Sequence, residues 1–342
     1  MRLRTPICDL LDIEAPVVLA GMGGVAHAEL CAAVSAAGGF GTLGMATLTP
    51  DQIRDQMREV RRRTDRPFGV DLLAALPDQM LEAMDVIVAE GASAFIAGLG
   101  VPGPVIEKCH AGGLKVMSMC GKVKHAIAAE EAGCDVVIAQ GTEAGGHTGQ
   151  VAGMALIPQV VDAVRIPVLA AGAIVDGRGL AAALAFGAQG AWMGTRFIST
   201  REAHAPEAYK KRVLEIGEDQ TIVTRCYSGK PMRVIRNAYV EDQERRPDEI
   251  KPFPHQFLVS VERNVLKGMQ LAVGELNQEV EPDRDCMPCG QGAGGVKDIP
   301  TCAEVIERMM TEASETIDRL AALAAPGSCP PDGTSWSQRG NK

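Results

Sequence analysis

Short apolar runs alternate with amphipathic segments between residues 15 and 200 of the chain. The runs begin about every 20 to 30 residues, which is the spacing of repeated β-strand and α-helix units. Within each run the apolar residues occupy consecutive positions instead of every second one, as in parallel strands that are covered on both faces. The pattern therefore predicts a parallel sheet enclosed by helices.

Eight of these runs are predicted as strands. They cover residues 15–21, 40–46, 67–73, 93–99, 115–120, 135–141, 166–172 and 190–197. Eight strand–helix units close into a (β/α)8 barrel, also called a TIM barrel. A doubly wound sheet is the competing α/β fold, but the chain has no GxGxxG fingerprint after its first strand. We therefore predict a (β/α)8 TIM barrel.

The segment from Thr49 to Thr64 shows how the helices between the strands are encoded. Thr49 and Gln52 form a capping-box pattern, and Pro50 stands at the first helical position, where its missing N–H group costs nothing. The apolar face is marked by Ile53, Met57 and Val60. This pattern predicts an amphipathic helix that packs on the sheet.

Residues 201–300 break the alternation and contain charged stretches such as residues 239–255. We interpret them as a mostly helical insertion with loops, placed after the eighth strand. Such an insertion is expected to form a lid or a substrate wall over the barrel of residues 1–200.

Residues 301–325 resume the helical pattern, with a capping box from Thr301 to Glu304. We predict that this long helix completes the barrel as its eighth helix. Its apolar face is predicted to contain Ile306, Met310, Ala313, Ile317 and Leu320. Residues 326–342 are predicted to form a flexible tail.

The 342 residues carry a formal charge of −9 at neutral pH, and the sequence pI is about 5.3. This acidic balance argues against nucleic acid or an anionic membrane as the main partner, because both are bound by basic patches. Acidic residues interrupt the apolar stretch of residues 1–16 before a signal-peptide core forms, and no later run is long enough for a membrane helix. We expect a cytoplasmic protein that binds a small molecule, with a homodimer left open as one oligomeric state.

Ten cysteines are spread along the chain, many of them inside apolar helix or strand patterns. That distribution is typical of reduced, structural thiols rather than of a disulfide framework. Only Cys286 and Cys289 have the spacing of a metal or redox motif, and no second ligand pair for zinc is spaced nearby. A Gly/Pro-rich loop without metal is the preferred interpretation.

Barrel enzymes place their active sites on the loops that follow the C-terminal ends of the strands. Four of those loops stand out by their small residues: 20–24, 140–150, 170–179 and 193–197. The last two follow strands seven and eight, where backbone N–H groups commonly bind a phosphate. We predict the phosphate site at Gly172, Ala173, Gly194 and Thr195.

The loop after the sixth strand contains the most specific candidate for chemistry, His147. Gly145 and Gly146 before it allow close approach of the backbone to a planar ligand. The histidine stands on a strand-end loop rather than on an apolar helix face, and its ordinary pKa of about 6.5 suits proton transfer. We predict that His147 is catalytic; the alternative is a histidine that only hydrogen-bonds a local carbonyl group.

Five motifs together resemble one known family. They are PVVLAGMGG, FGVDL, CDVVIAQGTEAGGHTG, LAAGAIVDGRGLAAAL and MGTRF, which span nearly the whole predicted barrel. The family is that of the nitronate monooxygenases, formerly called 2-nitropropane dioxygenases. Its fold is shared by FMN-dependent enoyl-acyl-carrier-protein reductases, NADH:quinone reductases and acyl-CoA-acting flavoenzymes. The resemblance implies an FMN-dependent oxidoreductase.

The resemblance also implies roles for individual residues. Gly21 and Met22 would border the flavin ring, and Gln140 would bind the flavin or its ribityl chain. Gly145 would lie against the cofactor, and His147 matches the active-site histidine of the family. The four predicted phosphate-binding residues match the positions that hold the FMN phosphate in the family.

Three further positions depend on this resemblance. Gln291, in the stretch CGQG, resembles a late loop that returns to the active site. Asp71 stands where the family commonly has the Asn of a GVN motif, and an ionised carboxylate there would disfavour a negatively charged reduced flavin unless it is protonated or paired. Ala173 replaces the second glycine of a common Gly-Gly pair, which is tolerable if its φ angle is negative.

The favoured function is the FMN-dependent oxidation of alkyl nitronates with O2, in which His147 binds the nitro oxygens or takes the α-proton. The alternative is an NAD(P)H-dependent FMN enzyme that acts on an enoyl or acyl thioester or on a quinone. The segments MRLRTP and GKVKHA resemble acyl-CoA-acting members from steroid breakdown. A barrel protein without catalysis is the third interpretation.

Overall fold

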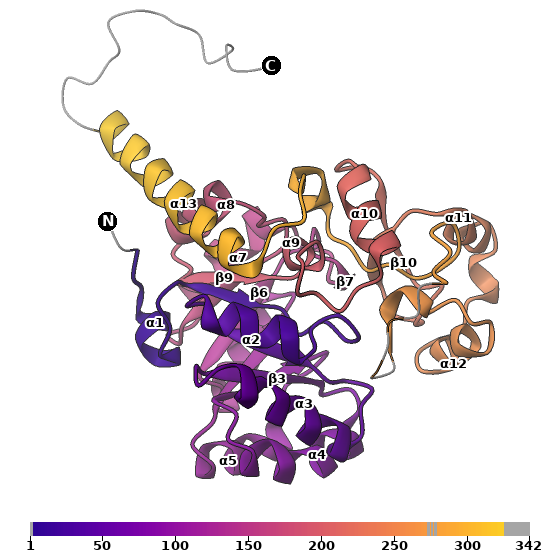
Figure 1. Ribbon diagram of the computed structural model, residues 1–342, viewed down its shortest axis with the longest axis horizontal. Coiled ribbons are helices and arrows are strands. Elements are labelled where there is room, and N and C mark those ends of the chain that lie inside the picture. Colours follow the sequence, from indigo (N-terminus) through magenta and orange to yellow (C-terminus); the bar gives the residue numbers. More distant parts are fainter. Residues whose placement is uncertain (1–2, 272–273, 275, 277–278, 325–342) are drawn as a thin grey trace, which may run out of the picture.

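The computed structural model describes residues 3–271, 274, 276 and 279–324, so the predicted tail lies outside the described residues. Its centre is a parallel sheet of eight strands in the order β1-β9-β8-β6-β5-β4-β3-β2 (Figure 1). The strands are β1 (Val17–Leu19), β2 (Gly41–Gly44), β3 (Phe68–Leu73), β4 (Ala94–Gly98), β5 (Lys115–Cys120), β6 (Val136–Gln140), β8 (Val168–Ala171) and β9 (Gly190–Met193). The Leu19 N–H donates to the Phe40 carbonyl oxygen at 2.9 Å, which joins β1 to the segment entering β2. The TIM barrel and its eight predicted strands are confirmed.

Helices follow the strands and cover the outside of the barrel (Figure 1). They are α2 (Ala28–Ala36), α3 (Pro50–Arg63), α4 (Pro77–Ala89), α5 (Gly103–Ala111), α6 (Val123–Glu131), α7 (Gly153–Ala163) and α8 (Gly177–Ala185). Helix α3 begins with the predicted capping box, in which Thr49 and Gln52 each bond the backbone of the other. Its three predicted apolar residues are buried, so the local pattern is confirmed.

The long helix α13 (Cys302–Ala324) packs against both α8 and α2, which is the place of the eighth helix. A Cβ atom on Gly177 would lie 2.3 Å from the Ala313 nitrogen, so this glycine lets the two helices approach closely. The predicted apolar face is only partly right, because Leu320 is 49% exposed. The buried residues of α13 end at Thr316, and beyond that point the helix projects past the barrel (Figure 1).

The strands are buried on both faces, which explains why their sequences show no alternation. Inside the barrel, one cluster contains side chains from all around the sheet, such as Val18, Ile96 and Trp192. The short helix α1 (Pro6–Leu11) adds Ile7 and Leu11 to the same cluster. The intervening strand residues pack outward against the helices. Among the described helices, none is long and apolar enough to cross a membrane.

The region after β9 is less helical than predicted. It contains α9 (Thr195–Ile198), α10 (Glu207–Glu215), α11 (Ala238–Glu244), α12 (His255–Glu262) and three 3-10 helices, η1 (Pro247–Glu249), η2 (Lys267–Met269) and η3 (Gln291–Gly295). It also contains an antiparallel hairpin of β10 (Thr221–Thr224) and β11 (Met232–Ile235). Strand β11 pairs in turn with β7 (Gly146–His147), which belongs to the loop after β6. The insertion is therefore attached to the barrel by a small three-stranded sheet.

Candidate active site

The C-terminal ends of the barrel strands open into a cavity of about 900 Å3. Its wall contains all but one of the residues predicted from the sequence, namely Gly21, Met22, Asp71, Gln140, Gly145, Gly146, His147, Gly172, Ala173, Gly194 and Thr195. Gln291 does not line the cavity, although its neighbours Gly290 and Gly292 do. Its backbone N–H instead donates to the Glu143 carbonyl oxygen at 2.9 Å. The strand-end loops thus converge on one site.

The loops after β8 and β9 form one wall of the cavity together with the late loop. The Thr195 hydroxyl accepts a hydrogen bond from the Gly290 N–H at 2.9 Å. A Cβ atom on Gly292 would lie 3.0 Å from the Ala173 Cα, so bare backbone is needed where these loops meet. This wall of small residues could hold a phosphate group.

Ala173 corrects one expectation from the sequence. Its φ angle is +55° rather than negative, and Gly172 before it has a φ of +114°. The left-handed region brings Cβ too close to the backbone carbonyl, at a cost of roughly 1–2 kcal/mol for a residue other than glycine. The loop therefore keeps a strained residue at the wall of the cavity.

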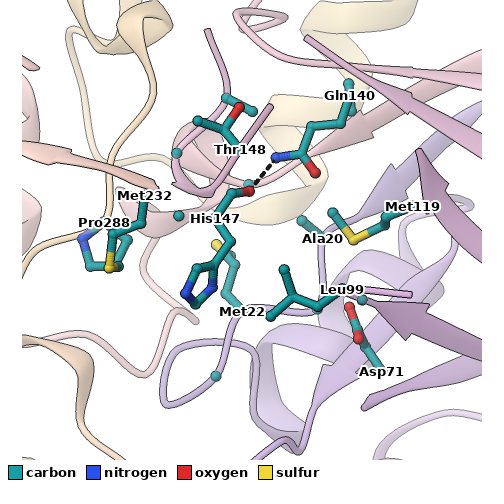
Figure 2. Close-up of a pocket in the computed structure, with 18 of the residues that line it drawn as sticks. Ala20, Met22, Asp71, Leu99, Met119, Gln140, His147, Thr148, Met232 and Pro288 are labelled. Atoms are coloured by element: carbon teal, nitrogen blue, oxygen red, sulfur yellow. Dashed lines mark hydrogen bonds between the residues drawn. The ribbon is translucent and has the colours of Figure 1, made fainter. Parts of the chain in front are cut away.

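Short strand β7 fixes the backbone of His147. Met232 of β11 is its partner in the antiparallel pairing. On the other side, the Gln140 side-chain N–H donates to the His147 carbonyl oxygen at 2.8 Å (Figure 2). Gly146 has a φ of +71°, and a Cβ atom there would meet nothing within 4 Å, so it borders open space. His147 is held by two elements rather than carried on a free loop.

Among the residues that the structure describes, the imidazole of His147 has one polar partner, the Ser228 hydroxyl, at 2.9 Å from Nε2. The Ser228 hydroxyl also lies 3.2 Å from the Lys230 carbonyl oxygen, to which it donates its single proton. It must then accept from His147 Nε2–H, which leaves Nδ1 as the unprotonated nitrogen. Burial, together with the positive charge of Lys230, lowers the pKa of His147 to about 4. The histidine is therefore neutral at physiological pH.

The sequence prediction missed Ser228 and Lys230, which line the cavity, and Arg233, which does not line it but bonds the loop after β6. Arg233 is buried and donates from Nε to the Thr142 carbonyl oxygen at 2.9 Å, so it ties the hairpin to the loop after β6. One signal was present: the runs TIVT and MRVI, separated by a Gly- and Pro-containing turn, are typical of a hairpin. No local sequence pattern predicts that this hairpin contacts His147.

Asp71 lines the cavity from strand β3, and Figure 2 draws the Leu99 side chain between it and His147. Only 6% of the surface of Asp71 is exposed. A Cβ atom on Gly21 would lie 2.3 Å from Asp71 Oδ2, so the carboxyl group packs directly on this glycine. Burial raises the pKa of Asp71 well above its ordinary value.

The mouth of the cavity is marked by lining residues that are also exposed. On one side these are Lys122 and His125, at the start of α6. Burial and, after it, the positive charges of Lys124 and Lys122 lower the pKa of His125, so the mouth carries a local group of positive charges in a chain of net charge −9. On the other side lie Pro254 and Leu258, from the insertion. The mouth therefore combines a basic edge with an apolar edge.

Cys286 and Cys289 are buried thiols, and burial raises the pKa of both. A Cβ atom on Gly145 would lie 2.9 Å from the Cys289 Cα, so the late loop packs on the glycine that precedes His147. Within the described residues, no three His, Cys, Asp or Glu side chains gather as a metal site. The role that the structure shows for this pair is packing.

Comparisons with known proteins agree with this geometry. A family model described as nitronate monooxygenase matches residues 4–84 and 77–312. The chain is 36% identical, over 94% of its length and 99% of the relative, to a (3aS,4S,5R,7aS)-5-hydroxy-7a-methyl-1-oxo-octahydro-1H-indene-4-carboxyl-CoA dehydrogenase from Mycobacterium tuberculosis. It is 34% identical to a probable nitronate monooxygenase from Staphylococcus saprophyticus, over 75% of this chain and 85% of the relative. The solved structure of FabK from Thermotoga maritima is similar with a TM-score of 0.83 at 34% identity, covering 94% of this chain and 99% of FabK.

Replacement of Ala173 by glycine is expected to stabilise the protein. The change removes the left-handed strain, and the greater freedom of glycine in the unfolded chain offsets about half of that gain, so the net effect is about 1 kcal/mol or less. The free energy of unfolding from urea denaturation measures it. Ala171→Gly is the matched control, because Ala171 lies in strand β8 and has no positive φ; that variant should lose stability. If Ala173→Gly lowers the free energy of unfolding as much as Ala171→Gly does, Ala173 is not strained.

Replacement of Lys230 by methionine is expected to raise the pKa of His147. The positive charge of Lys230 is the smaller of two causes that lower this pKa, so the value should move up from about 4 but stay below the ordinary value. An NMR titration of the His147 ring protons measures the change. Lys211→Met, at an exposed position outside the cavity wall, should leave the titration unchanged. An unchanged midpoint in Lys230→Met would show that this charge does not act on His147.

Proposed function

The chain belongs to the nitronate monooxygenase family, and we propose that it is an FMN-dependent oxidoreductase that exchanges an electron pair with the acyl chain of a coenzyme A thioester. The family membership makes the protein an enzyme of oxidoreductase type. The observation that carries the substrate class is the cavity, which has a mostly apolar wall and a basic mouth. The coenzyme A dehydrogenase among the relatives supports the same class.

The residues at the cavity wall fit FMN. Gly172, Ala173, Gly194 and Thr195 would hold its phosphate, since small residues there leave the backbone accessible. Gly23 and Gly146 border open space, because a Cβ atom on either would meet nothing within 4 Å. When bound, FMN supplies the capacity to accept and release an electron pair.

The size of the cavity and its apolar wall favour the larger of the two substrate classes. Its volume of about 900 Å3 is near the upper end of ligand pockets, which range from roughly 300 to 1,000 Å3. The wall is mostly apolar, and the insertion contributes Phe253, Phe257 and Leu271 to it. Beside FMN, an acyl chain or ring system would cover more of the remaining apolar wall than an alkyl nitronate of a few atoms.

The charge of the mouth fits the other end of such a substrate. Coenzyme A carries phosphate groups at the end remote from the thioester. Lys122 lines the cavity at an exposed position, and the charge of Lys124 acts on His125, which lines the cavity beside it. Lysine binds phosphate as a point charge. An apolar interior with a basic mouth therefore matches a molecule that is apolar at the reacting end and anionic at the other.

His147 and Ser228 supply the chemistry that the chain itself can perform. Because Ser228 accepts from Nε2–H, the Nδ1 lone pair of His147 is free to accept a proton or a hydrogen bond from a substrate. The low pKa of His147 keeps this nitrogen unprotonated at physiological pH. Ser228 is a positioning residue, since it fixes the tautomer and the orientation of the ring.

Oxidation of alkyl nitronates remains a second candidate, and one observation favours it. A neutral histidine at the cavity wall can take the α-proton of a nitroalkane or bind the nitro oxygens. The probable nitronate monooxygenase among the relatives points to the same reaction.

Anaerobic mixing of the FMN-loaded enzyme separates the two candidates. We expect that enzyme reduced by dithionite recovers its flavin absorbance when mixed with a 2-enoyl-CoA, and that oxidised enzyme keeps its absorbance when mixed with an alkyl nitronate. The reverse pattern would support the second candidate and contradict the first. NADH and NADPH are mixed separately with oxidised enzyme to identify the physiological reductant.

The double variant Lys122→Met/Lys124→Met tests the basic mouth in the same assay. Loss of two partly exposed charges should raise the enoyl-CoA concentration for half-maximal rate about fivefold, which corresponds to about 1 kcal/mol. The N-acetylcysteamine thioester of the same acyl group lacks the phosphates, so its half-maximal concentration should not change. Lys211→Met should affect neither substrate. An equal effect on both thioesters would contradict binding of the phosphates at the mouth.

A further inference from the structure

Asp71 occupies an unusual position for an acidic side chain. It lies near the C-terminal end of β3, where its partners in the sheet are Gly44 of β2 and Ile96 of β4. It lines the cavity, yet only 6% of the residue is exposed. Carboxyl groups are rarely buried to this degree without a partner, because loss of hydration destabilises the charged form.

The carboxyl group of Asp71 has no partner in the described part of the chain. No hydrogen bond or ion pair reaches its oxygens there, whereas Gln140, another buried polar side chain of the cavity wall, is hydrogen-bonded. Its neighbours are glycines: the position of a Cβ atom on Gly21 is 2.3 Å from Oδ2, and that on Gly98 is 3.7 Å from Oδ1. The missing side chains at these two glycines leave the space that the carboxyl group fills.

No positive charge from the described residues compensates the buried carboxyl group of Asp71. The titratable side chains that share the cavity wall are Lys122, His125, His147, Tyr209 and Lys230. Burial is the sole cause that moves the pKa of Asp71, so these groups do not counter it. The strands packed beside Asp71 contribute glycine and apolar side chains, and no charge, to its surroundings.

We propose that Asp71 rests as an uncharged carboxylic acid and donates the proton that enters the substrate in the redox reaction. Two titratable groups then share the cavity in neutral forms with opposite abilities: His147 can accept a proton and Asp71 can give one. When the environments of two titratable groups shift their pKa values in opposite directions, one site can provide both an acid and a base.

The proton transfer from Asp71 completes the reduction of an enoyl thioester, and it rests on the proposed function, which names that substrate class. Reduced FMN, when bound, would supply two electrons and one proton to the β-carbon of the carbon–carbon double bond. The α-carbon takes the second proton from the Asp71 O–H group. The product has a single bond, and Asp71 is left as a carboxylate that regains its proton from water.

The resting state of Asp71 is tested by the infrared difference spectrum between wild type and Asp71→Asn, both loaded with FMN and without substrate. We expect the C=O stretching band of a protonated carboxyl group at neutral pH, shifted in D2O and lost in Asp71→Asn. Asparagine keeps the size of the side chain, and FMN absorbance confirms that the variant is loaded. Asp85→Asn removes an exposed carboxylate that pairs with Lys108, so the band should remain. A wild-type spectrum identical to that of Asp71→Asn in this region would overturn the proposal.

A single-turnover experiment tests the proton transfer. Reduced Asp71→Asn enzyme should transfer electrons to 2-enoyl-CoA about 100-fold more slowly than wild type, as expected for loss of a general acid. The solvent isotope effect of the wild type should disappear in the variant. An unchanged rate would overturn the donor role. If wild-type enzyme rejects every enoyl-CoA but shows the infrared band, the proposed substrate class fails while the uncharged state of Asp71 stands.

Discussion

Closure of eight parallel strands into one barrel is the constraint on which the site depends. Parallel strands all end on the same side, so the loops after β1, β3, β6, β8 and β9 must meet at one rim even though they are far apart in sequence. The insertion adds a second constraint, because strand β11 pairs with β7 and fixes His147 over that rim. Backbone pairing between strands therefore fixes the position of the loops that form the cavity.

Burial then sets the charge of the cavity. It lowers the pKa of His147 and raises that of Asp71, since in both cases the charged form loses hydration. Neither Asp71 nor His147 then adds a charge to the interior, while the lysines at the start of α6 make the mouth positive. In the proposed function this division matches an apolar acyl group inside and phosphates at the surface. It also resolves the conflict expected from an ionised Asp71 beside a reduced flavin, because an uncharged carboxyl group does not repel it.

The sequence predicted what depends on local pattern. The eight strands and both capping boxes follow from runs and spacings of a few residues, and the structure contains them. The site residues on strand-end loops could be found because the barrel places such loops together. The pairing of His147 with Ser228 could not, since the two residues are 81 positions apart and meet only through the hairpin. The positive φ of Ala173 and the exposure of Leu320 likewise depend on tertiary packing, which the local pattern does not contain.

The most direct test of the account is a crystal structure of the protein with FMN. The account predicts the phosphate against Gly172, Ala173, Gly194 and Thr195, and the ring in the cavity between the wall with Asp71 and the wall with His147. A flavin bound outside this cavity would contradict it, as would a phosphate at any other loop.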